Sequence, residues 1–507
     1  MIVDKQHETI GFLERADSYG CAQAVEGLET HISRIFLAGD RAYKLKRAVD
    51  LPYVDFSTPA KRLAACEKEI SLNGRAAPSL YLGVRRITRD SDGRLAFDGP
   101  GEMVDAVVEM KRFGQDALFD RIATEGGLDA DLMERTAAMI ARFHDQAEID
   151  PDAVGDDNIA GVLSINEAGF ETSQVFEKDE AARFSALFRE RLERIAPHLN
   201  RRATDGKIRR CHGDLHLRNI CLIDGEPVLF DCIEFNDAIA TIDVLYDLAF
   251  LLMDLWHRDL QGYANLVANR YLDLTGDETG LVLLPFFMAL RAAVRAHVTA
   301  TQAEEAGEGE GKLVDEARSY FDLARAILEE KPAMLVAMGG YSGSGKSTVA
   351  DRVAPSVGAP PGARALETDR MRKSLYHVPP ETRLGPEAYT QAASDRVYDA
   401  VDRHARAVLT AGGPVVVNAV FSREAERQAI AQVADAAGVR FAGFWLEAPA
   451  DVLRARVAAR DRGPSDADEA VLAAQIRRGA GEIGWPRIDC TPPPDEVALT
   501  IVAKLDS

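Results

Sequence analysis

Two short stretches of this chain carry side chains suited to phosphate chemistry. The first, HGDLHLRN at residues 212–219, holds a carboxylate, Asp214, that can take a proton from an attacking hydroxyl group. The dipeptide Asp224-Gly225 follows between two apolar runs, which predicts a β-hairpin. Because a hairpin brings its two ends together, we expect Asn219 and Asp231 to lie side by side. An amide oxygen next to a carboxylate predicts a site for Mg²⁺ that bridges nucleotide phosphates.

The second stretch, GYSGSGKS at residues 340–347, fits the pattern GxxxxGK[ST]. An apolar run at 333–338 predicts a buried strand before it, and the residues after it predict a helix. Glycines in such a turn let backbone N–H groups converge on an anion at the helix N-terminus. We expect Lys346 to reach the β- and γ-phosphates and Ser347 to ligate Mg²⁺. The predicted nucleotide-binding residues are Gly340, Ser342, Gly343, Ser344, Gly345, Lys346, Ser347 and Thr348.

Further polar residues follow this second stretch. Asp369 lies in LETDRMR at 366–372. This half of the chain resembles small P-loop kinases, which keep substrate-binding groups after the second strand, and the resemblance implies such groups here, with Asp369 as the candidate catalytic carboxylate. Arg456 and Arg460 are four residues apart and therefore share one face of a predicted helix. We expect both arginines to bind the nucleotide and stabilise the phosphoryl group during transfer. The alternative is that they form ordinary salt bridges on the helix surface.

The first stretch, together with Leu229-Phe230-Asp231, resembles aminoglycoside phosphotransferase-type kinases, in which HGD replaces the HRD of protein kinases. This resemblance implies a two-lobed α+β domain that uses ATP and Mg²⁺. It also implies that Asp214 is the catalytic base and that Asn219 and Asp231 are the metal ligands.

The same resemblance implies a lysine on a strand of the amino-terminal lobe, held by a helix carboxylate near the ATP phosphates. The segment YKLK at 43–46 offers Lys44 and Lys46 on one strand face, because side chains alternate along a strand. We favour Lys46, with Lys44 as the alternative. Apolar spacing on the following helix favours Glu67 as the partner, whereas the resemblance favours Glu69, which we choose.

The second half resembles small P-loop kinases related to gluconate, shikimate and zeta-toxin kinases and to polynucleotide 5′-kinases. One residue departs from that pattern. The buried strand at 413–418 ends in Asn418, where those kinases usually carry Asp. Asn is uncharged and a weaker partner for metal-bound water, so catalysis in this half depends on another carboxylate, for which Asp369 is the candidate.

The elements that position these residues divide the chain into three predicted domains. Residues 1–113 alternate like strands with Asp-Gly turns and predict an amino-terminal lobe. Residues 114–330 are mostly helical and predict the second lobe. A polar Gly/Glu-rich segment at 301–311 precedes its last predicted helix, at 314–330, which could belong to either side of the boundary near residue 330. Residues 331–507 predict an α/β P-loop domain with a parallel sheet. The predicted fold class is thus an α+β kinase-like bilobal domain followed by an α/β P-loop domain.

Composition limits the partners of the chain. A net charge of −21 over 507 residues argues against non-specific wrapping of nucleic acid, which needs a basic surface. The six cysteines form no CxxC pair and indicate reduced thiols. The amino-terminal residues show no signal peptide, and apolar stretches such as 281–290 are too short to span a membrane. We expect a cytoplasmic protein without a membrane partner, and its oligomeric state stays open.

These observations favour a bifunctional kinase that transfers the γ-phosphoryl group of ATP to hydroxyl groups of small molecules, with one active site in each half. Two alternatives remain. One half could bind ATP without turnover and regulate the other, and Asn418 makes the second half the candidate for that role. The second half could also be a nucleic-acid 5′-kinase. The sequence does not identify either acceptor.

Overall fold

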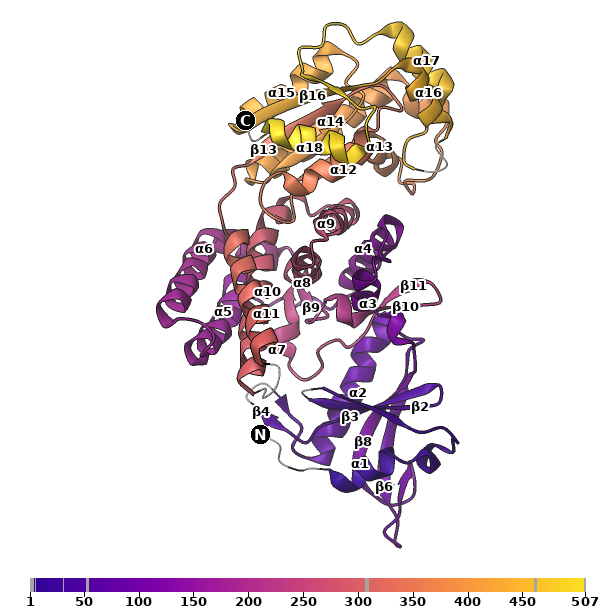
Figure 1. Ribbon diagram of the computed structural model, residues 1–507, viewed down its shortest axis with the longest axis vertical. Coiled ribbons are helices and arrows are strands. Elements are labelled where there is room, and N and C mark those ends of the chain that lie inside the picture. Colours follow the sequence, from indigo (N-terminus) through magenta and orange to yellow (C-terminus); the bar gives the residue numbers. More distant parts are fainter. Residues whose placement is uncertain are drawn as a thin grey trace. The chain divides into compact units, whose positions relative to one another are not determined.

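The computed structural model describes residues 4, 6–30, 32–51, 54–305, 310–459 and 463–505 (Figure 1). The chain divides into two compact units. The first comprises residues 1–168 with 185–254, and the second comprises residues 169–184 with 255–507. The fold is an antiparallel sheet with a helical kinase-like region, followed by a domain built on a five-stranded parallel sheet. The fold class predicted from the sequence is therefore confirmed.

The first unit begins with a six-stranded antiparallel sheet in the order β1-β2-β3-β8-β6-β7. Its strands are β1 (Glu26–Glu29), β2 (Ser33–Ala38), β3 (Arg41–Lys46), β6 (Tyr81–Arg89), β7 (Leu95–Phe97) and β8 (Glu102–Lys111). Helix α2 (Pro59–Ala76) packs against this sheet, and the Thr58 side chain caps it by accepting from the N–H of Lys61. Cys66 and Ala65 on α2 are buried, as are Val107 and Val108 on β8.

The helical region of the first unit carries the predicted catalytic loop. Helices α4 (Ala130–Asp145) and α8 (Val244–His257) supply buried apolar faces, and the short strands β9 (Ile208–Arg210) and β12 (Thr241–Asp243) pair antiparallel. The hairpin β10 (Ile220–Ile223) to β11 (Glu226–Leu229) follows the loop, with Asp224 and Gly225 in the left-handed conformation that its turn requires. Helices α3 (Phe119–Thr124) and α7 (Asp237–Ala240) also belong to this region. Helices α5 (Gly155–Thr172) and α6 (Lys178–Thr204) lie mostly in the first unit, but their residues between 169 and 184 belong to the second.

The second unit contains the parallel sheet, in the order β14-β15-β13-β16-β17. Its strands are β13 (Met334–Gly339), β14 (Arg364–Glu367), β15 (Val415–Asn418), β16 (Arg440–Glu447) and β17 (Arg487–Asp489). One face of the sheet is buried against α12 (Lys346–Val353) and α18 (Pro494–Leu505). Helices α14 (Gln391–Thr410) and α15 (Glu424–Ala437) pack together and against strands of the same sheet (Figure 1). Shorter helices α13 (Thr368–Leu375), α16 (Ala450–Ala458) and α17 (Glu469–Arg478) follow β14 and β16.

The second unit also includes helices that precede residue 330, namely α9 (Gln261–Thr275), α10 (Leu284–Glu305) and α11 (Glu310–Ile327). The buried guanidinium of Arg364, at the start of β14, pairs with Asp273 at 2.6 Å and with Glu278 at 2.7 Å. The Asn265 amide of α9 donates to the Pro361 and Ala363 carbonyls at 2.9 and 3.0 Å. Charge pairing and hydrogen bonds therefore join α9 to the P-loop sheet, and the second unit begins well before residue 330.

One segment of the described chain, Glu278–Glu304, is long and apolar enough to cross a membrane, with a mean hydropathy of 1.6. The helix extends beyond the stretch 281–290 that the sequence analysis considered. In the structure, 67% of its most apolar window is buried, and α10 packs along α11. A core helix gives the same composition, so this segment is weak evidence for a membrane span.

Candidate active sites

Both lysines of β3 converge on one carboxylate of α2. Lys44 Nζ lies 3.0 Å from Glu69 Oε1, and Lys46 Nζ bonds to Glu69 Oε2. Lys44 also bonds to Asp231, whereas Lys46 bonds to Glu234. Burial alone disfavours the charged form of Lys44, but Asp231 and Glu69 outweigh it and raise its pKa well above the ordinary value.

The two lysines differ in what they face. Lys46 is fully buried between Glu69 and Glu234, whereas Lys44 reaches the half-exposed carboxylate of Asp231. The geometry therefore favours Lys44, the alternative of the sequence analysis, as the lysine that meets a phosphate. The choice of Glu69 agrees with its contacts to both lysines. Glu67 instead lies on the exposed face of α2, 3.9 Å from Arg86.

Glu234 is a member of this cluster that the sequence analysis missed. It lies three residues after Asp231 in FDCIEF and is 4% exposed. Burial raises the pKa of Glu234, and the neighbouring Lys46 opposes that rise. An acidic residue so close to the predicted metal ligand could have been chosen as a candidate from the sequence. Only the fold shows that it contacts Lys46 of β3.

The predicted catalytic loop arranges Asp214 and Asn219 in direct contact. The Asn219 amide nitrogen donates to the Asp214 carboxylate and to its backbone carbonyl, both at 2.9 Å. Because the nitrogen is used in this way, the amide oxygen of Asn219 is the end left for a cation. His216 Nε2 lies 3.2 Å from the same carboxylate of Asp214.

The hairpin that follows the loop brings position 219 next to the segment that carries Asp231. Ile220 pairs with Leu229, and the Phe230 N–H donates to the Asn219 carbonyl at 3.1 Å. Asp231 itself has a φ of 65°, and its N–H donates to the Tyr81 hydroxyl at 3.0 Å. The backbone thus brings the predicted metal ligands to neighbouring positions, as the turn signal led us to expect.

A buried aspartate holds this loop from α8. Asp247 accepts from the His212 N–H at 3.1 Å and from the Gly213 N–H at 2.8 Å. Burial lowers the pKa of His212, so the neutral ring donates from Nε2 to the Phe230 carbonyl at 2.9 Å. His144, Cys211 and Asp247 also cluster at a spacing that a metal could use. Because Asp247 already serves the loop and lies 3.0 Å from His144 Nε2, this cluster braces the loop.

The P-loop of the second unit has the predicted strand-turn-helix context. Strand β13 leads into the glycine-rich turn, and α12 begins at Lys346. Gly343 has a φ of 84°, and a Cβ there would lie 2.5 Å from the Leu453 carbonyl, so glycine is required by both conformation and packing. Lys346 Nζ donates to the Tyr341 carbonyl at 3.0 Å.

Three oxygen groups meet at the start of α12. The Ser347 hydroxyl lies 2.5 Å from Glu367 Oε1 and 3.4 Å from Asn418 Oδ1. A hydroxyl, a carboxylate and an amide oxygen are hard ligands of the kind that Mg²⁺ takes. Burial, followed by the neighbouring Asp369, raises the pKa of Glu367 to about 7.

Glu367 supplies the carboxylate that Asn418 lacks, which the sequence analysis assigned to Asp369. Parallel pairing explains this placement, because Glu367 ends β14 directly opposite Asn418 at the end of β15. Asp369 lies two residues later in the first turn of α13, close enough to raise the pKa of Glu367. Asp369 therefore stays the predicted base, and Glu367 is the residue that touches Ser347.

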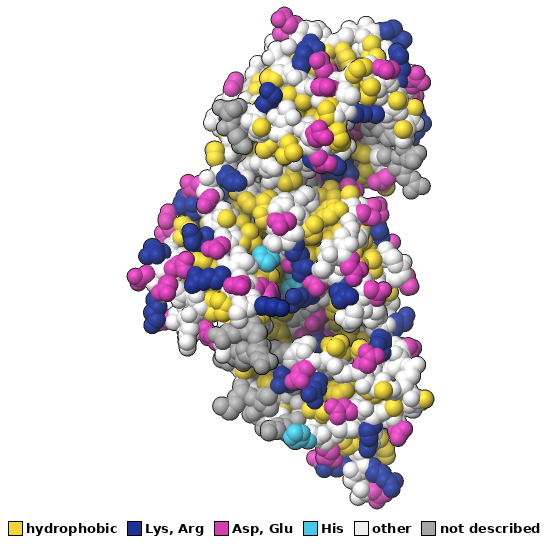
Figure 2. Space-filling view, viewed as in Figure 1, with side chains coloured by type: hydrophobic (Ala, Val, Ile, Leu, Met, Phe, Trp, Pro, Cys, Tyr) yellow, Lys and Arg dark blue, Asp and Glu magenta, His cyan; other side chains and the backbone are white. Residues whose placement is uncertain are grey.

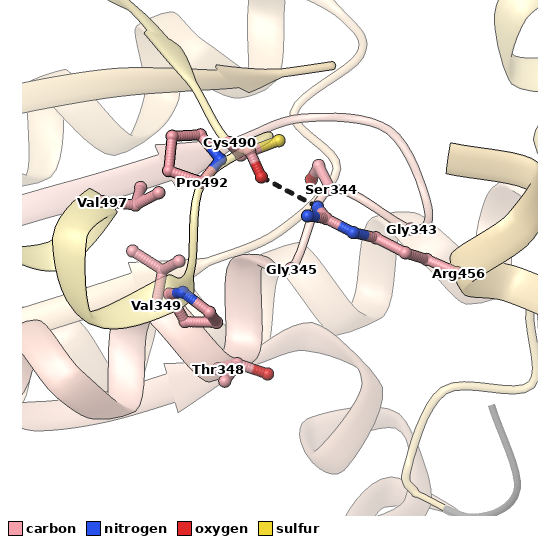
Figure 3. A pocket seen from close by; sticks show the side chains of 10 residues that line it. Gly343, Ser344, Gly345, Thr348, Val349, Arg456, Cys490, Pro492 and Val497 are labelled. Atoms are coloured by element: carbon pink, nitrogen blue, oxygen red, sulfur yellow. Dashed lines mark hydrogen bonds between the residues drawn. The ribbon is translucent and has the colours of Figure 1, made fainter. Parts of the chain in front are cut away.

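Arg456 of α16 lines a cavity of about 350 Å³ beside the P-loop (Figure 3). Its guanidinium donates to the Cys490 and Thr491 carbonyls at 2.9 and 3.2 Å, which holds it across the cavity from Thr348 (Figure 3). The other predicted arginine, Arg460, lies outside the described residues. The cavity is lined by Gly343, Ser344, Gly345, Thr348, Val349, Arg456, Cys490, Pro492, Pro494 and Val497.

Two family matches cover the regions that hold these sites. Residues 117–281 match the phosphotransferase enzyme family, and residues 335–480 match an AAA domain family. Both resemblances inferred from the sequence are confirmed by these matches.

One similar protein extends over nearly the whole chain, and two similar solved structures cover parts of it. The uncharacterized protein Rv2004c of Mycobacterium tuberculosis (strain H37Rv) is 29% identical over 474 residues, which is 92% of each chain. A gluconokinase structure from Sinorhizobium meliloti matches 35% of this chain and 95% of its own, at 24% identity and a TM-score of 0.26. A choline/ethanolamine kinase family structure from Mesorhizobium loti matches 61% of this chain and 90% of its own, at 13% identity and a TM-score of 0.38.

Proposed function

Because the chain joins a domain of the phosphotransferase enzyme family to an AAA-type P-loop domain, we propose that it is a bifunctional ATP-dependent kinase. Each half transfers a phosphoryl group to a hydroxyl group of a small molecule. The observation that carries this proposal is that each unit has its own lysine and its own cluster of oxygen groups of the kind that Mg²⁺ takes. These are Lys44 with Asn219 and Asp231 in the first unit, and Lys346 with Ser347, Glu367 and Asn418 in the second.

In the first unit, the residues divide the work of phosphoryl transfer. Lys44 binds the α- and β-phosphates, while Glu69 fixes its position. Asn219 and Asp231 hold Mg²⁺, which neutralises phosphate charge when bound. Asp214 accepts the proton of the acceptor hydroxyl, and its contact with Asn219 keeps base and metal ligand in register.

In the second unit, the P-loop N–H groups and Lys346 hold the phosphates at the start of α12. Ser347 and Glu367 hold the metal, with Asn418 as a neutral third ligand. Arg456 lines the same cavity as Thr348, where it can contact the bound nucleotide. Asp369, in the first turn of α13, is the base for the acceptor hydroxyl.

The contact between Ser347 and Glu367 favours a catalytic second half over the regulatory alternative, because it restores the carboxylate that Asn418 cannot supply. On the face drawn in Figure 2, basic and acidic side chains are interspersed without a continuous basic strip. This distribution, with the net charge of −21, gives no support to the nucleic-acid alternative. We keep the cytoplasmic location as part of the proposal.

The proposal is tested by incubating the full chain with ATP, Mg²⁺ and a metabolite extract, and recording compounds that gain the mass of one phosphate. We expect two sets of products, one lost in Asp214→Ala and the other lost in Lys346→Ala. If Lys346→Ala loses no product while Asn418→Asp creates a new one, the regulatory alternative is correct. Phosphorylation of oligonucleotide 5′ ends that disappears in Lys346→Ala would support the nucleic-acid alternative.

A further inference from the structure

One side chain from outside the P-loop reaches its backbone. Gln475 of α17 accepts from the Ser342 N–H through its Oε1, at 2.9 Å. A side chain from α17 therefore engages a backbone N–H group of the P-loop. Gln475 belongs to none of the sequence motifs described above. Only the packing of α17 brings it to the P-loop.

The same peptide unit is held at its other end by the P-loop lysine. The carbonyl of Tyr341 and the N–H of Ser342 belong to one peptide plane. Lys346 Nζ donates to that carbonyl at 3.0 Å, while Gln475 accepts from the N–H. Two groups thus fix the orientation of one peptide, and hydrogen bonds at both ends of an amide polarise one another.

Packing fixes Gln475 at this place. Leu472 and Ile476, on either side of it along α17, pack with Tyr341 and with Leu453 and Val457 of α16. The rings of Tyr341 and Trp445 pack in a T-shaped arrangement, with centroids 5.5 Å apart and an angle of 87° between the ring planes. The helix that carries Gln475 is therefore built onto the same P-loop residue whose peptide Gln475 holds.

We propose that Gln475 is a positioning residue that keeps the Tyr341–Ser342 peptide oriented for phosphate binding, which rests on the proposed nucleotide site of the second unit. When Lys346 turns from the Tyr341 carbonyl to the phosphates, Gln475 remains as the group that holds this peptide. Without it, nothing holds the N–H end of this peptide, which can then rotate about the bonds on either side of it. Rotation would break the hydrogen bonds at both ends of this peptide and disturb the turn from which Lys346 and the P-loop N–H groups bind the phosphates, which would weaken their binding.

The test is calorimetric titration of the full chain with ATP and Mg²⁺. Because each unit has a proposed ATP site, two binding phases are expected in the titration curve. The phase that is lost in Lys346→Ala is assigned to the P-loop site. We expect Gln475→Met, which keeps the volume and loses the acceptor, to weaken only that phase by about fivefold to tenfold, the size of one hydrogen bond. The matched control is Gln428→Met, an exposed glutamine on α15 that bonds to Glu424, and it should leave the phase unchanged.

A second variant separates positioning from general stability. Gln475→Glu keeps an acceptor for Ser342 but adds a negative charge near the phosphates. Its loss of affinity should disappear at high salt, which screens charge, whereas the loss in Gln475→Met should persist. Unchanged or tighter binding in Gln475→Met would overturn the inference, as would equal salt dependence of the two variants. If Lys346→Ala loses no phase, the proposed nucleotide site itself is wrong.

Discussion

Lys44 of β3 bonds directly to the carboxylate of Asp231, 187 residues farther along the chain. The contact joins the lysine that we assign to the phosphates with the aspartate that we assign to the metal. Lys44 also donates to Glu69 of α2 at 3.0 Å. If the proposed roles are correct, we expect bound nucleotide and metal to compete with this contact, because Lys44 would then bind phosphate and Asp231 would bind the metal.

The two lysines of β3 predict different losses. Lys44→Met should abolish transfer by the first half, because the phosphates lose their cation, while the chain stays folded. Lys46→Met should instead destabilise the fold by about 3 kcal/mol or more, since Glu234 would remain buried without the cation that bonds to it, and Glu69 would keep only Lys44. Product formation and urea unfolding measure the two effects, with the exposed Lys61→Met as the control. Intact stability in Lys46→Met would contradict this division of roles.

Asp214 and Lys346 predict independent losses. Asp214→Ala removes the base of the first half and should lower its turnover by roughly 10² to 10⁴-fold, with little change in ATP affinity. Lys346→Ala should silence the second half alone. Quantifying the two product sets by mass spectrometry, with ATP titration in parallel, checks both statements. Coincident loss of both sets in either variant would mean that the two sites are not independent.

Glu367 predicts which carboxylate serves the second half. Glu367→Gln should abolish Mg²⁺-dependent turnover there, because Ser347 and Asn418 alone offer only neutral oxygens. Asn418→Asp should change turnover much less, since a carboxylate is already in place. Initial rates across a Mg²⁺ series measure both effects, and the exposed Glu424→Gln on α15 serves as the control. Normal rates in Glu367→Gln would return the role to Asp369.

The pairing of Arg364 with Glu278 predicts how the second unit responds to acid. Burial alone would raise the pKa of Glu278, but Arg364 and His404 outweigh it and lower the pKa to about 2. A depressed pKa contributes stability that is present above about 4.5, the ordinary value, and is lost as pH falls toward 2. Melting temperatures between pH 6 and pH 3 should therefore fall more steeply in the wild-type chain than in Glu278→Gln.

The same variant should be less stable at pH 6 by about 3 kcal/mol, because it leaves a buried charge of Arg364 without one partner. The exposed Asp435→Asn on α15 is the control and should follow the wild-type curve. If the melting temperatures of the wild-type chain and Glu278→Gln fall in parallel with pH, the pair of Arg364 and Glu278 does not stabilise the second unit.

Local signals predicted much of both sites. Asp224-Gly225 predicted the hairpin that brings position 219 beside the segment of Asp231, because a tight turn leaves one register for its strands. The GxxxxGK[ST] pattern predicted a strand, a glycine turn and a helix, and each is present. Such features depend on residues close in sequence, so they can be predicted without knowing the rest of the fold.

Contacts between distant segments were decided by the tertiary structure. Strand alternation places Lys44 and Lys46 on one face of β3. Only the tertiary structure shows that Lys44 bonds to the half-exposed carboxylate of Asp231, whereas Lys46 bonds to the buried carboxylate of Glu234. Parallel pairing of β14 with β15 sets Glu367 opposite Asn418, and α17 brings Gln475 to Ser342. The sequence determined which residue types and turns are available. The packing of elements far apart in the chain determined which of those residues meet, because that depends on burial summed over the whole core.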